Sequence, residues 1–259
     1  MRVANKYQIQ KQIGIGSFGT LFQGVNLRTG EKVAIKKESL QTPYKLLKNE
    51  SRILHWLSRV PGVPEMKGFH VDADHQYLVM TLLGEPILKT NPAALFIQNS
   101  LPLFGILEVI HDKGIVHRDI KPEHFLASSH DPSQWVLVDF GFATFYVEEI
   151  GGKHKEQTRI SQLIGSPNYA SLGVHERWEP LRRDDVESLI YTLMFLHGEN
   201  ELPWIHETDE PRIYDKKRDA RTNPSVPAAF RSMLFYVDGL AVKERPNYGF
   251  LTACLKILN

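Results

Sequence analysis

Two acidic motifs lie close together near the middle of the chain. The first is His117-Arg118-Asp119-Ile120-Lys121-Pro122-Glu123-His124, and the second is Asp139-Phe140-Gly141. In such a pair, Asp119 can accept the proton of a hydroxyl group, and Asp139 can hold a metal ion against nucleotide phosphates. Lys121, two residues after Asp119, can supply positive charge to a transferring phosphoryl group. The residue types and their spacing therefore predict phosphoryl-transfer chemistry.

His124 occupies the position, five residues after Asp119, where asparagine is expected as a metal ligand. An amide oxygen is a hard, neutral ligand that suits Mg²⁺, whereas imidazole favours softer ions, and Mn²⁺ lies nearer its preference. Histidine can also be protonated, which repels a cation. We therefore expect slower catalysis, a shift towards Mn²⁺ and loss of activity at mildly acidic pH. The alternative is that one metal ion on Asp139 suffices and His124 only fills space.

A glycine-rich motif near the start of the chain predicts a loop that covers phosphates. It is Gly14-Ile15-Gly16-Ser17-Phe18-Gly19, between strands predicted at 7–15 and 20–27. Glycines let backbone N–H groups approach phosphate oxygens closely. The same spacing opens dinucleotide-binding folds, but in those folds a helix follows directly. Here the next element is a further strand with Val33-Ala34-Ile35-Lys36, which favours a hairpin lying over a nucleotide.

Lys36 is a cation on an otherwise apolar strand. It can hold the α- and β-phosphates if an acid orients it, or it can be a strand lysine whose tip reaches solvent. The candidate acid is Glu50, in a helix predicted from about 44 to 57. The predicted buried stripe of this helix is Leu46, Leu47, Ile53, Leu54 and Leu57. Glu50 shares a helix face with Leu54, four residues later, so its side chain can point towards the core. We therefore favour the interpretation that Lys36 binds the nucleotide phosphates.

The remaining elements predict an α+β, bilobal fold. The predicted strands after the helix are 66–72, 76–82, 115–116 and 135–138, and the predicted helices are 95–110 and 185–197. A polar stretch at 142–164 without clear periodicity predicts a mobile activation segment. We expect a small β-rich N-terminal lobe with one long helix, residues 1–83, a hinge at 81–86 and a larger helical C-terminal lobe, residues 84–259.

Composition excludes several classes of protein. The chain has 259 residues, 42% of them hydrophobic, and a formal net charge of +1. These values indicate a globular protein and give no sign of a nucleic-acid or membrane partner. The single cysteine, Cys254, allows no internal disulfide, and the start of the chain does not resemble a secretory signal. We expect a cytoplasmic protein, with the nucleus as a second location, and a monomer by default.

With these motifs the chain resembles the protein kinase superfamily over nearly its whole length. Within that superfamily it resembles the casein kinase I family. Leu163-Ile-Gly-Ser-Pro-Asn-Tyr-Ala-Ser171 resembles the family's Leu-x-Gly-Thr-x-x-Tyr-Ala-Ser segment. Arg182-Arg-Asp-Asp-Val-Glu-Ser-Leu189 resembles the start of a family helix, and Leu202-Pro-Trp204 and Arg245-Pro-Asn-Tyr248 match further family motifs. The resemblance implies a Ser/Thr protein kinase that needs ATP and a divalent metal ion. It also implies activity without phosphorylation of the activation segment.

The predicted site has three parts. The catalytic residues are Asp119, Lys121, Lys36 and Glu50. The ATP-binding residues are Ile13, Gly14, Gly16, Ser17, Phe18, Gly19, Leu21, Ala34, Lys36, Met80, Thr81, Leu83 and Leu126. The metal ligands are Asp139 and His124, for Mg²⁺ or Mn²⁺. Backbone groups near Thr81 to Leu83 would bind the adenine edge, and Met80 would line the pocket, although core packing also explains Met80. His117 is expected to be a structural member of the loop.

The resemblance implies protein substrates that are acidic or already phosphorylated. Relatives carry an arginine where this chain has Asn168, so a bidentate anion contact is lost. Basic residues remain at 182–183 and at 216–221. The second group is a solvated face, an anion-binding patch or a nuclear-import patch.

Two other functions stay open. A pseudokinase that binds nucleotide or acts as a scaffold is supported only by His124, because the other charged residues of the site are present. A small-molecule kinase is disfavoured by Lys121 and by the segment at 163–171. Thr158 and Ser161 are either plain loop residues or phosphate acceptors with Arg118 as the partner.

Overall fold

The structure is a computed structural model that describes residues 1–16, 19–87, 96–148 and 152–258. The chain forms two compact units. The first comprises Met1–Glu85 and Leu126–Phe142, and the second comprises Pro86–Phe125 and Ala143–Asn259. A single cut in the sequence does not reproduce this division, because the stretch with Asp139 belongs to the first unit. The predicted lobe boundaries stay a prediction.

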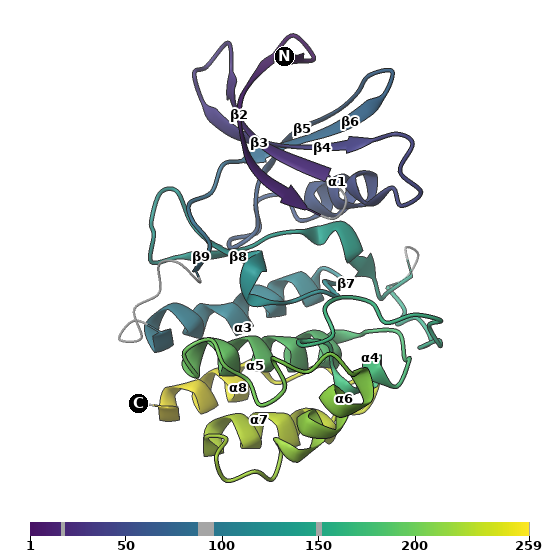
Figure 1. The fold of residues 1–259 in the computed structure, drawn as a ribbon, viewed down its shortest axis with the longest axis vertical. Helices are drawn as coiled ribbons and strands as arrows, with labels where there is room; N and C mark the ends of the chain where they lie inside the picture. Colours follow the sequence, from purple (N-terminus) through teal and green to yellow (C-terminus); the bar gives the residue numbers. More distant parts are fainter. Residues whose placement is uncertain (17–18, 88–95, 149–151, 259) are drawn as a thin grey trace. The chain divides into compact units, whose positions relative to one another are not determined.

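The first unit is built on a six-stranded antiparallel sheet with the strand order β1-β2-β3-β4-β6-β5 (Figure 1). Its strands are β1 (Arg2–Val3), β2 (Tyr7–Gly16), β3 (Gly19–Asn26), β4 (Lys32–Ser39), β5 (Met66–Val71) and β6 (His75–Thr81). The hairpin predicted around the glycine motif is therefore present as the β2–β3 pair. The strand pair predicted after the helix is also confirmed, as β5 and β6.

The alternation of side chains along β4 separates the two faces of the sheet. One face forms a core cluster of Val3, Tyr7, Val33, Ile35, Tyr77 and Val79. Ala34 and Lys36 point to the other face. Met80 lies opposite Ala34 on β6, and Leu21 lies opposite Lys36 on β3. Since directly opposed residues share a face, these four residues of the predicted nucleotide site lie on one side of the sheet.

Helix α1 (Leu46–Trp56) packs against β5 and β6. It is slightly shorter than the predicted helix. The predicted stripe is buried at Leu47, Ile53, Leu54 and Leu57, whereas Leu46 is only half-buried. Strands β8 (Phe125–Ala127) and β9 (Trp135–Leu137) form a second, two-stranded sheet. The Leu137 N–H donates to the carbonyl oxygen of Gly62 at 2.9 Å, which ties β9 to the loop after α1.

The second unit is mainly helical. Its helices are α3 (Phe96–Asp112), α4 (Leu172–His175), α5 (Arg182–His197), α6 (Glu210–Asp219), α7 (Ala228–Asp238) and α8 (Tyr248–Leu255). Helix α5 is central: it packs against α3, α4 and α7, and residues 184–194 are all buried (Figure 1). It begins earlier than predicted, at Arg182, because Asp184 in its first turn reaches back and accepts the N–H of the N-cap residue Leu181 at 2.8 Å. Among the described residues, no helix has the length and apolar character needed to cross a membrane.

Two short strands lie near the catalytic motif. β7 (Ile115–Val116) pairs antiparallel with β10 (Thr144–Phe145). The stretch predicted to lack regular structure, 142–164, therefore begins with a strand, and Val147 and Arg159 each form an isolated bridge further on. The prediction missed these pairings because their partners are distant in sequence, so no local periodicity reveals them. Residues 149–151 of this stretch lie outside the described residues.

Candidate active site

Lys36 lies between two carboxylates of the first unit. Its Nζ is 2.7 Å from Oε2 of Glu50 and 2.9 Å from Oδ1 of Asp139. Burial lowers the pKa of Lys36, but the two carboxylates outweigh this effect and raise it above its ordinary value. The amine is therefore charged at neutral pH. Acids orient it, as expected of a lysine that binds the α- and β-phosphates, and its tip does not reach freely into solvent.

Glu50 connects helix α1 to the sheet. Its side chain is inside the unit, with 1% of the residue exposed, on the face of α1 that also carries Leu54. Burial raises the pKa of Glu50, and the charge of Lys36 opposes that shift. Because a buried carboxylate without a partner costs several kcal/mol, the Lys36–Glu50 pair favours one position of α1 on β4.

Asp139 adopts a φ of 65°, a left-handed conformation that is uncommon outside glycine. A short helical turn, Phe140–Phe142, follows directly. Phe140 is fully buried, and the Gly141 carbonyl accepts a hydrogen bond of 3.0 Å from Nδ2 of Asn49. The side chain of Asp139 is 42% exposed, so its carboxylate can meet a metal ion as well as Lys36.

All of the predicted ATP-binding residues belong to the first unit. Ala34 and Met80 are buried, whereas Ile13 is 42% exposed at the edge of the sheet. The Thr81 N–H donates to the carbonyl oxygen of Glu65 at 3.0 Å, so this backbone donor is used within the unit and not for adenine. The prediction that backbone groups near Thr81 to Leu83 bind adenine stays a prediction, but it no longer includes the Thr81 N–H. Ser17 and Phe18 lie outside the described residues.

The glycines of the β2–β3 hairpin differ in what the fold requires of them. A Cβ on Gly19 would lie 2.4 Å from the Lys37 carbonyl oxygen, so the sheet itself requires glycine there. A Cβ on Gly14 or Gly16 would meet no atom closer than 3.6 Å or 3.8 Å. Packing among the described residues does not explain these two glycines. Their predicted role, close approach of backbone N–H groups to phosphate, does explain them.

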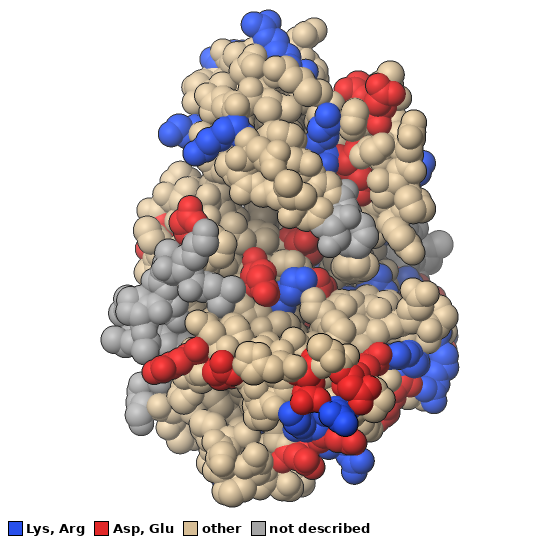
Figure 2. Space-filling model, viewed as in Figure 1, with Lys and Arg blue, Asp and Glu red and all other residues tan. Residues whose placement is uncertain are grey.

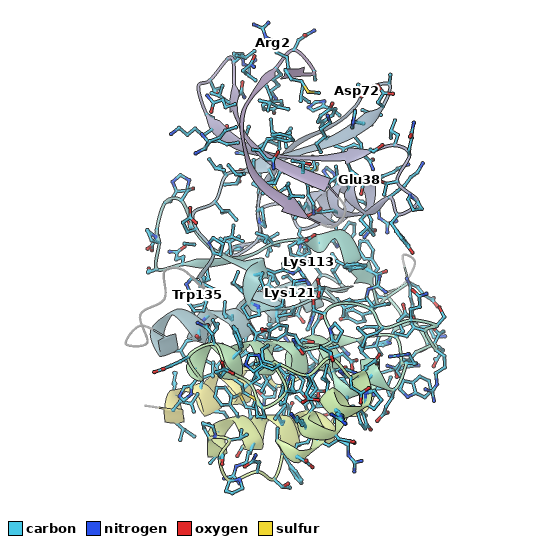
Figure 3. All side chains as sticks on the ribbon, viewed as in Figure 1. Arg2, Glu38, Asp72, Lys113, Lys121 and Trp135 are labelled. Carbon is cyan, nitrogen blue, oxygen red and sulfur yellow. The ribbon has the colours of Figure 1, made fainter. Side chains whose placement is uncertain are left out.

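Asp119, Lys121 and Ser166 form a cluster in the second unit. Nζ of Lys121, which Figure 3 labels, lies 3.0 Å from Oδ2 of Asp119 and 2.9 Å from Oγ of Ser166. The Ser166 hydroxyl donates to Oδ1 of Asp119 at 3.0 Å. Both carboxylate oxygens are therefore oriented, and Asp119 is 7% exposed. A carboxylate held in this way can accept a hydroxyl proton, with a cation beside it to stabilise developing negative charge.

His124 anchors itself to the same loop. Its Nδ1 is 2.7 Å from the carbonyl oxygen of Asp119. A carbonyl only accepts hydrogen bonds, so Nδ1 carries the proton, and in the neutral ring the lone pair is on Nε2. Asparagine could make the same donor bond and present an amide oxygen instead. The imidazole fits a metal ion that accepts nitrogen ligands, and its ring is oriented by the backbone bond.

The two predicted metal ligands belong to different units, Asp139 to the first and His124 to the second. In the described part of the chain, no three or more His, Cys, Asp or Glu side chains gather as a metal-binding group. A metal ion on either ligand would therefore need oxygen atoms from water or from phosphate to complete its shell, as Mg²⁺ commonly does.

Asp185, at the start of α5, holds the backbone of the catalytic loop. Its carboxylate accepts the N–H groups of His117 at 2.6 Å and Arg118 at 2.8 Å, and His111 Nε2 lies 3.0 Å away. These bonds stabilise the left-handed φ of 71° at Arg118. The buried ring of His117 accepts the Asp119 N–H at 3.3 Å, which confirms that His117 is a structural member of the loop.

Sequence reasoning assigned no role to Ser166, Asp185 or Gly165, although all three lie in the quoted motifs. Gly165 has a φ of 85°, and a Cβ there would lie 2.6 Å from the Arg118 carbonyl oxygen. Only glycine lets the 163–171 segment approach the catalytic loop so closely. The Gly165-Ser166 pair and the spacing of Asp185 in its motif were the available signals.

Arg118 has an acidic partner in the described structure. Its guanidinium NH1 lies 3.6 Å from Oε1 of Glu179, and the Thr158 hydroxyl donates to the other Glu179 oxygen at 2.9 Å. Glu179 therefore supplies the negative charge beside Arg118. This favours the interpretation of Thr158 as a loop residue over a phosphate acceptor paired with Arg118.

The sheet with its Lys36–Glu50–Asp139 group and the helical unit with its Asp119 loop define a phosphotransferase of mixed α+β, bilobal kinase architecture. A comparison with family models agrees: the protein kinase domain model matches residues 7–174. The match covers more than half of the chain, which belongs to the protein kinase domain family. Members of this family are kinase transferases that generally use ATP and Mg²⁺.

Proposed function

We propose that this protein is an ATP-dependent Ser/Thr protein kinase of the casein kinase I type, which transfers the γ-phosphoryl group of ATP to protein hydroxyls. The observation that carries the proposal is the Asp119 carboxylate, held by Lys121 and Ser166 at 2.9–3.0 Å. The Lys121-Pro122 pair after the base resembles Ser/Thr-type loops. The 163–171 segment, which contributes Ser166, resembles that of casein kinase I.

Each charged group has a part in the transfer. Asp119 orients the acceptor hydroxyl and takes its proton as the oxygen attacks phosphorus, while Lys121 stabilises charge on the transferring group. Lys36, held by Glu50, neutralises the α- and β-phosphates. Bound Mg²⁺ or Mn²⁺ would neutralise the phosphates further, with Asp139 and His124 as its ligands. The bond between His124 and the Asp119 carbonyl supports a shift towards Mn²⁺, because it directs a nitrogen rather than an oxygen lone pair.

We infer that the substrates are acidic protein segments that need no priming phosphate. Asn168 is uncharged, and two of the four basic residues in 216–221 pair with acids: Lys216 with Glu207 at 2.9 Å, and Arg221 with Glu187 at 2.8 Å. Figure 2 shows basic and acidic residues interspersed over the lower part of the visible surface rather than a basic patch. We place the protein in the cytoplasm or nucleus, as a monomer.

The alternative function is a pseudokinase that binds nucleotide or acts as a scaffold. His124 is the observation that favours it, since an imidazole at this position weakens Mg²⁺ binding. The same geometry is compatible with catalysis in Mn²⁺. An active kinase and a pseudokinase therefore differ in whether phosphate is transferred in Mn²⁺.

The test is phosphate transfer from ATP to a casein-type acidic substrate, in Mg²⁺ and separately in Mn²⁺. Native protein, Asp119→Asn and His124→Asn are compared, with nucleotide binding measured in parallel by thermal shift. We expect transfer that Asp119→Asn abolishes and that His124→Asn raises in Mg²⁺. Nucleotide binding without transfer in either metal would refute the kinase proposal and leave the pseudokinase. Transfer to small alcohols but not to protein would indicate a small-molecule kinase.

A further inference from the structure

Lys217, in the last turns of α6, is fully buried. Its Nζ donates to the carbonyl oxygens of Pro167 at 2.7 Å and Ala170 at 2.6 Å, and it lies 3.1 Å from Nε2 of His175. The carbonyls belong to the 163–171 segment. An amine with three near partners, two of them backbone oxygens of one segment, fixes the local course of that segment.

Arg221, four residues later, acts through Glu187 on the residue that directly follows the same segment. Its guanidinium binds Asp238 at 2.8 and 2.9 Å, Glu187 at 2.8 Å and the Tyr191 hydroxyl at 3.0 Å. It also donates to the Lys217 carbonyl at 2.8 Å. The side chains of Arg221 and Glu187 are 8% and 6% exposed. This is a buried and extensively bonded ion pair, which a lysine cannot reproduce.

Glu187 connects Arg221 to the backbone that follows the segment, because it binds both. Its Oε1 accepts the N–H of Leu172 at 3.2 Å, where α4 begins. Ser171, one residue earlier, donates to Asp184 at 2.5 Å. Side chains therefore hold the segment 163–171 itself and the residue that follows it, Leu172. Helix α6 supplies Lys217 for the segment, and the turn after α6 supplies Arg221, which acts on Leu172 through Glu187.

We propose that Lys217 and Arg221 are positioning residues that fix the 163–171 segment in the conformation that binds a protein substrate. The proposal rests on the proposed kinase function, because the segment matches the substrate-binding segment of protein kinases by resemblance. The geometry gives a reason for the effect: Ser166 of this segment bonds Asp119 and Lys121, and Gly165 lies against the catalytic loop. A shift of about 1 Å in the segment would misplace both the acceptor and Ser166.

The experiment compares native protein with Arg221→Lys, Arg221→Met and Lys217→Met. The matched control is Arg245→Gln, which breaks an exposed arginine's ion pairs with Glu108 and Asp112 elsewhere in the second unit. Two measurements are made on each protein. One is steady-state kinetics with an acidic peptide and with ATP varied in turn, and the other is hydrogen exchange followed by mass spectrometry over 163–176 and 186–194.

We expect the peptide KM to rise about tenfold or more in Arg221→Met and less in Arg221→Lys, with the ATP KM within about twofold of native. In the Arg221 variants, amide hydrogen exchange should become faster in residues 163–176. It should stay slow in residues 186–194, which shows that the core of α5 is intact. The control should match the native protein in both measurements. Lys217→Met should show the same pattern, and if it does not fold, the Arg221 variants still provide the test.

An unchanged exchange rate in 163–176 for Arg221→Met would overturn the proposal. Equal increases in the peptide and ATP KM values would also overturn it, because they indicate general destabilisation rather than positioning. If native protein transfers no phosphate, the kinase function fails, but the exchange measurement still decides whether Lys217 and Arg221 hold the segment.

Discussion

Replacing Lys36 by methionine should destabilise the protein because of what it does to Glu50. Methionine keeps much of the apolar stem of lysine and removes the charge that lies 2.7 Å from Glu50. Glu50, 1% exposed, is then a buried carboxylate with Asp139 nearby and no cation on it. Burial, and then the charge of Asp139, raise the pKa of Glu50 even in the native protein. In the variant, the least costly response is for Glu50 to bind a proton.

The size of this effect follows from proton linkage. At pH 7 the unfolded chain ionises Glu50, whose ordinary pKa is about 4.3, whereas the folded variant keeps it protonated. Holding a proton about 2.7 pH units above the ordinary pKa costs about 4 kcal/mol, at 1.36 kcal/mol per unit. At pH 5 the same difference is about 1 kcal/mol. The folded variant binds more protons than the unfolded chain, so its stability rises as pH falls from 7 towards 4.

The assay is urea unfolding at pH 7 and pH 5. Lys37→Met is the matched control, since Lys37 is the next residue on β4 and its Nζ lies 6.0 Å from the Tyr77 ring. We expect Lys36→Met to lose up to about 4 kcal/mol at pH 7 and much less at pH 5, and Lys37→Met to change little at either pH. The double variant Lys36→Met/Glu50→Leu should regain stability but not activity. A deficit that is the same at both pH values would refute this reasoning.

Three further predictions concern the second unit. Ser166→Ala removes a hydrogen bond to the Asp119 carboxylate, worth about 1.5–3 kcal/mol, so kcat should fall about 10- to 150-fold, while Ser166→Thr should retain most activity. Gly165→Ala should abolish transfer, because a Cβ would lie 2.6 Å from the Arg118 carbonyl at a φ of 85°; near-native kcat would contradict this. Burial, and then Lys217, lower the pKa of His175 to about 4, so the folded state keeps its ring neutral while the unfolded chain protonates near pH 6.5. Stability should fall by up to about 3 kcal/mol between pH 6.5 and 4 in urea unfolding, and His175→Gln should remove that slope.

Local patterns in the sequence predicted the strands of the first sheet and the helix that packs on it. Alternation and glycine turns predicted strands β2 to β6, and helical spacing predicted α1 with Glu50 on its inner face. The Lys36–Glu50 contact followed from these two elements and a known motif order. By contrast, Lys121 and Ser166 are 45 residues apart, and their contact depends on how the intervening chain folds. No periodicity in the sequence predicts such a contact, which is why Ser166 was missed although its segment was recognised.

The first turns of α5 show why these long-range contacts concentrate at one place. Three buried acids there each hold a different group: Asp185 the backbone of the catalytic loop, Asp184 the Ser171 hydroxyl and Glu187 the Leu172 N–H. Burial raises the pKa of Asp184 to about 6, whereas at Asp185 the hydrogen bond from His111 and its other partners outweigh burial and lower the pKa. Buried charges contribute little net stability, so a general stabilising role does not explain three acids in this place. A positioning role explains them, because α5 fixes both the Asp119 loop and the segment that carries Ser166.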